Sequence, residues 1–152
     1  MYHWTIGVLI LLGVAFAHGH AQDLRAHRWE NRVVLLVGEE VRAGSSTALP
    51  AEWAEQLREL AGDPAGLVER KLVVYQVTPQ GYRRGLETDG GWRGKADLYW
   101  KYSRWRTPFQ VLLIGLDGGV KLRQTEVLPR AELFARIDGM PMRKAELQRR
   151  GD

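Results

Sequence analysis

The chain contains no cysteine among its 152 residues. Disulfides, thiolate nucleophiles and thiolate metal ligands are therefore excluded, and with them thiol peroxidase and disulfide-exchange activity. Histidine is scarce as well, and three of its four occurrences lie within the first 21 positions. Those 21 positions contain no Asp, Glu, Lys or Arg, so the formal net charge of +4 belongs to the rest of the chain. This charge favours anionic partners, but it is too diffuse for a nucleic-acid-binding surface.

An uncharged apolar run at residues 5–17 is too short for a membrane span, which needs about 20 apolar residues, and has the length of a secretory signal core. We expect residues 1–21 to be a signal peptide cleaved after Ala21, which gives a periplasmic or secreted protein without stable membrane insertion. Cleavage after Ala17 is one alternative, because Ala15-Phe16-Ala17 also fits the cleavage rule. An uncleaved membrane anchor is the other.

Apolar runs and glycine stops predict the order β-α-β-α-β-β-α, with a short extra helix before the second strand. Strands separated by helices imply parallel pairing, and Asp117-Gly118-Gly119 predicts a hairpin turn that adds an antiparallel edge. This is the order of an α/β, thioredoxin-like three-layer fold with a mixed sheet and a C-terminal antiparallel hairpin. We expect one domain over 22–144 and a charged flexible tail over 145–152. The predicted core consists of Val34, Leu36, Leu57, Val73, Tyr75, Leu112, Ile114, Leu133 and Ile137.

Four segments resemble one bacterial family. They are Arg28-Trp29-Glu30-Asn31-Arg32-Val33-Val34-Leu35, the stretch 61–67, the stretch 111–123 around Asp117-Gly118-Gly119, and Ile137-Asp138-Gly139-Met140-Pro141-Met142-Arg143. The family is a domain of unknown function in the P-DUDES group of thioredoxin-like, peroxiredoxin-related proteins. This group also includes domains of the animal sushi-repeat-containing and coiled-coil-domain-containing matrix proteins. The resemblance implies a thioredoxin-like fold and an extracytoplasmic setting, but it supplies no catalytic residue.

In thioredoxin-like enzymes the reactive thiolate follows the first strand, at the start of the first helix. The corresponding loop here, residues 38–50, offers only hydroxyls and carboxylates, including Ser45 and Ser46. A serine nucleophile needs a neighbouring base, and no histidine lies near in sequence. A hydrolase-like or other thiol-independent enzyme using this loop is therefore an alternative, and we expect no catalytic residue in it.

Metal binding has two weak candidates. If cleavage fell after Ala17, the new N-terminus would start His18-Gly19-His20, and His18 and His20 with a free amine would suit Cu(II) or Ni(II). Met140 and Met142 are soft ligands without a visible third partner, so they are interpreted as packing groups. We expect no cofactor and no metal in the protein cleaved after Ala21.

A basic and aromatic stretch at 81–106 carries seven Lys or Arg against three acidic residues. Aromatic rings beside cations suit sugars, lipid headgroups or a protein partner. We therefore expect binding or scaffolding at the cell envelope. The expected partner is an envelope component or a protein, with anionic partners among the candidates, and not a nucleic acid. The candidate binding residues are Trp92, Arg93, Trp100, Arg104 and Arg106, with both tryptophans expected to be exposed.

Overall fold

The computed structural model describes residues 24–104 and 107–151. The predicted signal peptide, His18, His20 and Arg106 lie outside the described residues. None of the described helices combines the length and the apolar character needed to cross a membrane.

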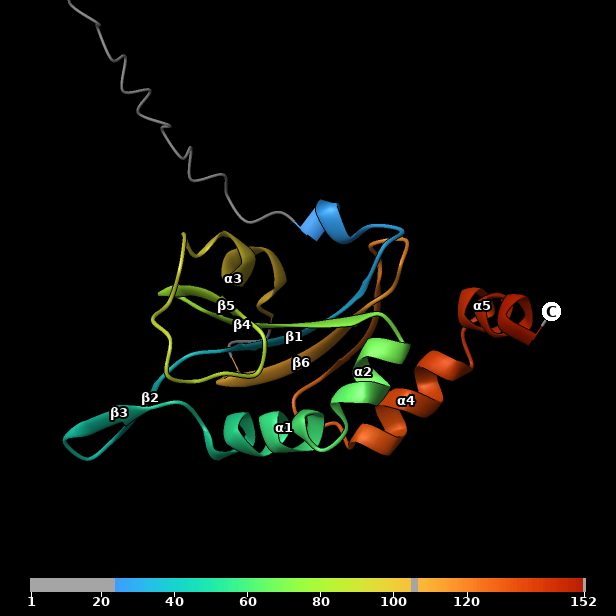
Figure 1. Ribbon diagram of the computed structural model, residues 1–152. Helices are drawn as coiled ribbons and strands as arrows, with labels where there is room; N and C mark the ends of the chain where they lie inside the picture. The colour runs from blue at the N-terminus through green and yellow to red at the C-terminus, as the bar shows by residue number, and fades with distance from the viewer. Residues whose placement is uncertain (1–23, 105–106, 152) are drawn as a thin grey trace, which may run out of the picture.

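Five strands form one mixed sheet in the order β5-β4-β1-β6-β7 (Figure 1). Central β1 runs parallel to β4 and antiparallel to β6. All seven residues of β1 are buried, because its apolar side chains alternate between two covered faces. The strands are β1 (Arg32–Gly38), β4 (Leu72–Thr78), β5 (Gly81–Arg84), β6 (Phe109–Ile114) and β7 (Val120–Gln124).

Helices cover both faces of this sheet (Figure 1). On one face α1 (Ala51–Ala61), α2 (Pro64–Glu69) and α4 (Arg130–Asp138) pack over one apolar cluster. On the other face α3 (Asp97–Tyr102) and the 3-10 helix η1 (Leu24–His27) pack over a second cluster. Residues alternate between the clusters along β1, with Val34 and Leu36 in the first and Val33, Leu35 and Val37 in the second.

The mixed α/β sheet and its C-terminal hairpin are confirmed. However, β6 pairs with β1 in antiparallel fashion, whereas we expected strands separated by a helix to be parallel. The cause is β5, an unpredicted strand that runs antiparallel to β4. The chain then returns beside β5, where Arg93 bridges Tyr82 in antiparallel fashion, before it enters α3. It therefore starts β6 beside the end of β1, with Phe109 opposite Gly38. Short β2 (Val41–Ala43) and β3 (Ser46–Ala48) form a second unpredicted hairpin.

The predicted core is buried except at one position. Val73 is only partly buried and packs at the margin of the second cluster, while the other eight residues are at most 7% exposed.

The expected flexible tail is a further correction, because residues 145–151 belong to helix α5 (Pro141–Gly151). The helix is polar, so periodicity of apolar residues did not reveal it. Ion pairs hold it in place. The Arg143 side chain is 1% exposed and contacts Glu69 and Asp138, while Glu146 pairs with buried Arg32.

Candidate functional site

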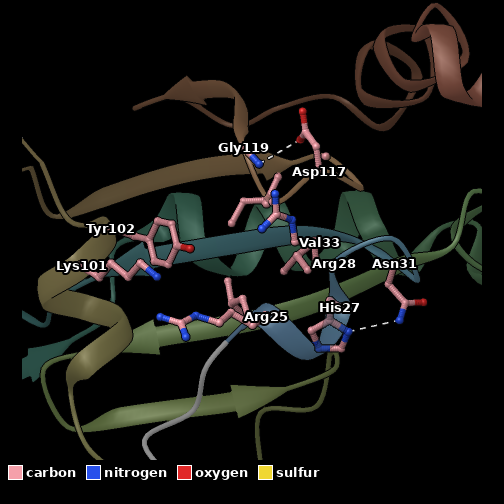
Figure 2. A pocket seen from close by; sticks show the side chains of 13 residues that line it. Arg25, His27, Arg28, Asn31, Val33, Lys101, Tyr102, Asp117 and Gly119 are labelled. Carbon is pink, nitrogen blue, oxygen red and sulfur yellow. Dashed lines mark hydrogen bonds between the residues drawn. The ribbon is translucent and has the colours of Figure 1, made fainter.

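A cavity of about 290 Å³ lies between η1, the end of α3 and the β6–β7 turn (Figure 2). We call it the η1 pocket. Its apolar part consists of Leu24, Val33 and Ile114, all members of the second core cluster. Its polar part consists of Arg25, His27, Arg28, Asn31, Lys101, Tyr102, Asp117 and the backbone of Gly115, Gly118 and Gly119.

The β6–β7 turn has the conformation that its glycines permit. Gly118 has φ +80°, in the left-handed region that favours glycine. Its N–H donates to Gly115 O at 3.0 Å, and the Gly115 N–H donates to Gly119 O at 2.9 Å. Asp117 closes the turn by accepting from the Gly119 N–H at 2.9 Å. The turn is therefore rigid where it borders the pocket.

His27 anchors η1 to the sheet. Its Nε2 lies 2.8 Å from Tyr75 Oη, and its Nδ1 lies 3.2 Å from Asn31 Nδ2. Because an amide nitrogen donates, Nδ1 accepts and Nε2 carries the proton that is donated to Tyr75. Burial, and secondarily the charge of Arg84, lower the pKa of His27. The histidine is thus neutral near pH 7, and it positions η1 rather than adding positive charge to the pocket.

The charge of the η1 pocket is predominantly positive. Arg25 and Arg28 extend from η1 and the residue after it, and Lys101 extends from α3 (Figure 2). Among the residues that the structure describes, no carboxylate forms an ion pair with Arg28 or Lys101. The Arg28 side chain lies against the ring of Trp29, and that of Lys101 against the ring of Tyr102.

The single carboxylate of the pocket is already engaged. Asp117 Oδ2 lies 2.6 Å from Lys121 Nζ. The hydrogen bond from Lys121, with that from the Gly119 N–H, lowers the pKa of Asp117. The charge of Asp117 is therefore balanced by Lys121, and Arg28 and Lys101 are the pocket cations available to attract an anion.

The two tryptophans predicted from the 81–106 stretch lie over different faces of the sheet. Trp92 is partly buried rather than exposed, because its ring packs edge-on against Trp53 at 6.3 Å and under the Arg83 guanidinium at 3.9 Å. Trp100 is 72% exposed as expected, but it lies on α3, over the other face of the sheet. Neither tryptophan lines the η1 pocket.

The two described arginines of that prediction have different surroundings. Arg104 is exposed and donates to the carbonyls of Lys101 and Ser103, at 3.0 and 2.7 Å, at the end of α3. Arg93 is exposed and lines a separate cavity of about 460 Å³ with Arg83, Arg84, Glu87 and Asp89. The acidic residues of that second cavity offset part of its positive charge.

The loop at 38–50 is mainly the exposed β2–β3 hairpin. Ser46 Oγ donates to the carbonyl of Ala43 at 3.1 Å. His27, the one histidine in the described residues, precedes β1, whereas the hairpin follows it, so the length of β1 separates the two. The described part of the chain therefore brings no histidine base to these serines.

The described residues contain no group of three or more His, Cys, Asp or Glu side chains placed to hold a metal ion. Of the two methionines considered as soft ligands, Met140 packs partly buried against the first core cluster and Met142 is 42% exposed.

Sequence reasoning missed the η1 pocket because its cations are far apart in the chain. Two of the segments that carry the family resemblance meet there, however, since Arg28 and Asn31 come from one and the 115–119 turn from another. That convergence was the available signal. The burial of Arg32 and Arg143, each 1% exposed, was also missed, because arginine is rarely buried unless it is paired.

The fold and site define a cysteine-free α/β domain with a cation-lined pocket. The model of the family described as Domain of unknown function (DUF4174) matches residues 23–146, and the chain belongs to that family. No significant match was found among curated proteins or among solved structures.

Proposed function

We propose that this protein is a thioredoxin-like domain of the P-DUDES group that works at the cell envelope by binding an anionic ligand, without thiol chemistry. The sheet order supports the thioredoxin-like part. Strands β4, β1, β6 and β7 are adjacent in that order, with one parallel and two antiparallel pairings. Helices α1 and α4 cover one face of the sheet and α3 covers the other.

The observation that carries the binding proposal is the η1 pocket, where Arg25, Arg28 and Lys101 surround a cavity with an apolar floor. Arginine presents several N–H donors in a plane and suits carboxylate and phosphate oxygens. The apolar floor suits a carbon skeleton. A volume of about 290 Å³ equals that of roughly ten water molecules in the liquid. This size suits one acidic group on a small skeleton, such as a sugar acid.

Thermal unfolding in the presence of small ligands tests this proposal. Glucuronate, inorganic phosphate and neutral glucose form the panel, because they separate a carboxylate, a phosphate and an uncharged sugar. A ligand that binds only the folded state stabilises it by about 2.7 kcal/mol at a hundred times its Kd. We expect stabilisation by at least one anion, none by glucose, and a smaller effect at high salt.

Variants then locate the site. The changes Arg28→Gln and Lys101→Gln should each remove most of the stabilisation, since each deletes one pocket cation without disturbing a buried residue. Arg93→Gln is the matched control, because Arg93 is exposed and lies outside the pocket. The assignment of the η1 pocket as an anion site would be refuted if no anion of the panel stabilised the protein. It would also be refuted if the stabilisation persisted in both Arg28→Gln and Lys101→Gln.

A further inference from the structure

A groove of about 630 Å³, separate from the cavity around Arg93, lies between α5 and the start of β1. We call it the α5 groove. Its lining includes Trp29, Lys71, Leu116, Met142, Arg149 and Arg150. It is separate from the η1 pocket, with which it shares no lining residue.

Two residues of the α5 groove have strained backbones. Trp29 has φ 69° and Lys71 has φ 51°, and they are the two non-glycine residues with positive φ in the described chain. Side chains larger than hydrogen disfavour this region, and such conformations concentrate at functional sites. The Trp29 ring is 56% exposed, with the Arg28 guanidinium 5.4 Å from its centre. Burial of the Trp29 side chain therefore does not explain why the strain persists.

The wall formed by α5 is fixed by the ion pairs at its N-terminal half. Arg143 donates to Glu69 Oε1 at 2.6 Å and to Asp138 Oδ1 at 3.2 Å. Glu146, 10% exposed, lies 3.3 Å from Arg32. The α5 groove is thus a built feature and not the gap beside a loosely attached helix.

The charge of the α5 groove is positive. Lys71, Arg149 and Arg150 line it, and its one acidic residue, Glu146, is shared by Arg32 and Arg143 and lies 3.9 Å from the Lys71 Nζ. The exposed apolar groups beside these cations are the ring of Trp29 and the side chain of Met142, 42% exposed. Tryptophan with neighbouring cations is the combination that binds the headgroup level of an anionic bilayer.

We propose that the α5 groove docks the protein peripherally on a membrane containing anionic phospholipid. Trp29 and Met142 enter the headgroup region, and Lys71, Arg149 and Arg150 bind lipid phosphates. The length of the apolar run 5–17 predicts an export signal, so we expect the mature protein to be released at a membrane surface. A protein that crosses a membrane meets such a surface first, which favours lipid over an acidic protein partner.

Sedimentation with vesicles tests this proposal on the exported protein. Vesicles of phosphatidylcholine alone are compared with vesicles that also contain phosphatidylglycerol. We expect binding only to the latter and a loss of binding at high salt. Removing Arg149 and Arg150 together, as Arg149→Gln with Arg150→Gln, should weaken binding about 30-fold. The charge-preserving pair Arg149→Lys with Arg150→Lys should still bind, which separates charge from any effect on α5.

The tryptophan is tested in the same way. Trp29→Asn should lose vesicle binding while stability stays the same or rises, since asparagine tolerates positive φ. Trp100→Asn is the matched control, because Trp100 is also exposed but lies on α3. Brominated lipid should quench tryptophan fluorescence in Trp100→Phe and not in Trp29→Phe.

Three outcomes would overturn the proposal: no binding to phosphatidylglycerol vesicles, equal loss in the Trp29 and Trp100 variants, or displacement by inorganic phosphate at the lipid's own phosphate concentration. The last would indicate a site for a free anion. The η1 pocket is assessed independently, since Lys101→Gln, which changes no residue of the α5 groove, should leave vesicle binding within a few-fold of wild type.

Discussion

Replacing Arg143 with alanine should lower the free energy of unfolding by about 3 kcal/mol. The Arg143 side chain is 1% exposed and donates to the Glu69 carboxylate at 2.6 Å, the Glu69 carbonyl at 3.1 Å and Asp138 at 3.2 Å. Removing one partner of a buried ion pair costs about 3–5 kcal/mol. The low end applies here because the side chains of Glu69 and Asp138 are 48% and 36% exposed and regain water.

Urea unfolding followed by circular dichroism measures this change, with the m-value expected to stay the same. Arg104→Ala is the control, because Arg104 is exposed and its removal should change stability by less than about 0.5 kcal/mol. A loss below about 1 kcal/mol in Arg143→Ala would show that the ion pairs do not hold α5, and would remove the argument that the α5 groove is rigid.

The same variant has a characteristic pH dependence. Burial by itself would raise the pKa of Asp138, but hydrogen bonds from Arg70 and Arg143 outweigh burial and lower it. A carboxylate with a lowered folded pKa stabilises the protein above its unfolded pKa of about 3.9, and this stability is lost as pH falls through the folded pKa. Wild type should therefore lose more stability than Arg143→Ala below about pH 4. Equal losses would contradict this role of Arg143.

Three further predictions follow from the core, from His27 and from the N-terminus. Leu112→Ala should cost about 2–5 kcal/mol in urea unfolding, because Leu112 is fully buried, and a cost under about 1 kcal/mol would contradict its place in the core. Burial, then the charge of Arg84, lower the pKa of His27, so wild type should lose stability as pH falls below about 6.5. His27→Gln should lack that slope, and an identical slope in both proteins would assign it to other groups. Intact mass of the exported protein should correspond to a start at Gln22; retention of residues 1–21 in a membrane fraction would instead indicate an anchor.

The sequence predicted the elements whose signal is local. Strands β1, β4 and β6 are continuous apolar runs, and α1 shows Trp53, Leu57 and Leu60 on one face, so periodicity and length identify them. Strand β5 was missed because it has only four residues, Gly81–Arg84, of which one is glycine and two are arginine. The β2–β3 hairpin was missed because its strands have three exposed residues each.

The candidate sites required contacts between distant parts of the chain. Helix α5 is polar, and it is fixed by Glu69, 74 positions before Arg143. The η1 pocket combines cations of η1 and α3, which no window of sequence places together. The concentration of charge at 81–106, in contrast, can be read from the sequence because its residues are neighbours in the chain. The fold then places Trp92 and Trp100 over different faces of the sheet.

Anion binding in the η1 pocket can be observed directly by heteronuclear NMR titration of isotope-labelled protein with the anion that stabilises it best. We expect the amide signals of Asn31, Gly118 and Gly119 to shift together and saturate at one Kd, and Arg28→Gln to abolish these shifts. Saturable shifts confined to the cavity around Arg93, or pocket shifts that persist in Arg28→Gln, would contradict it.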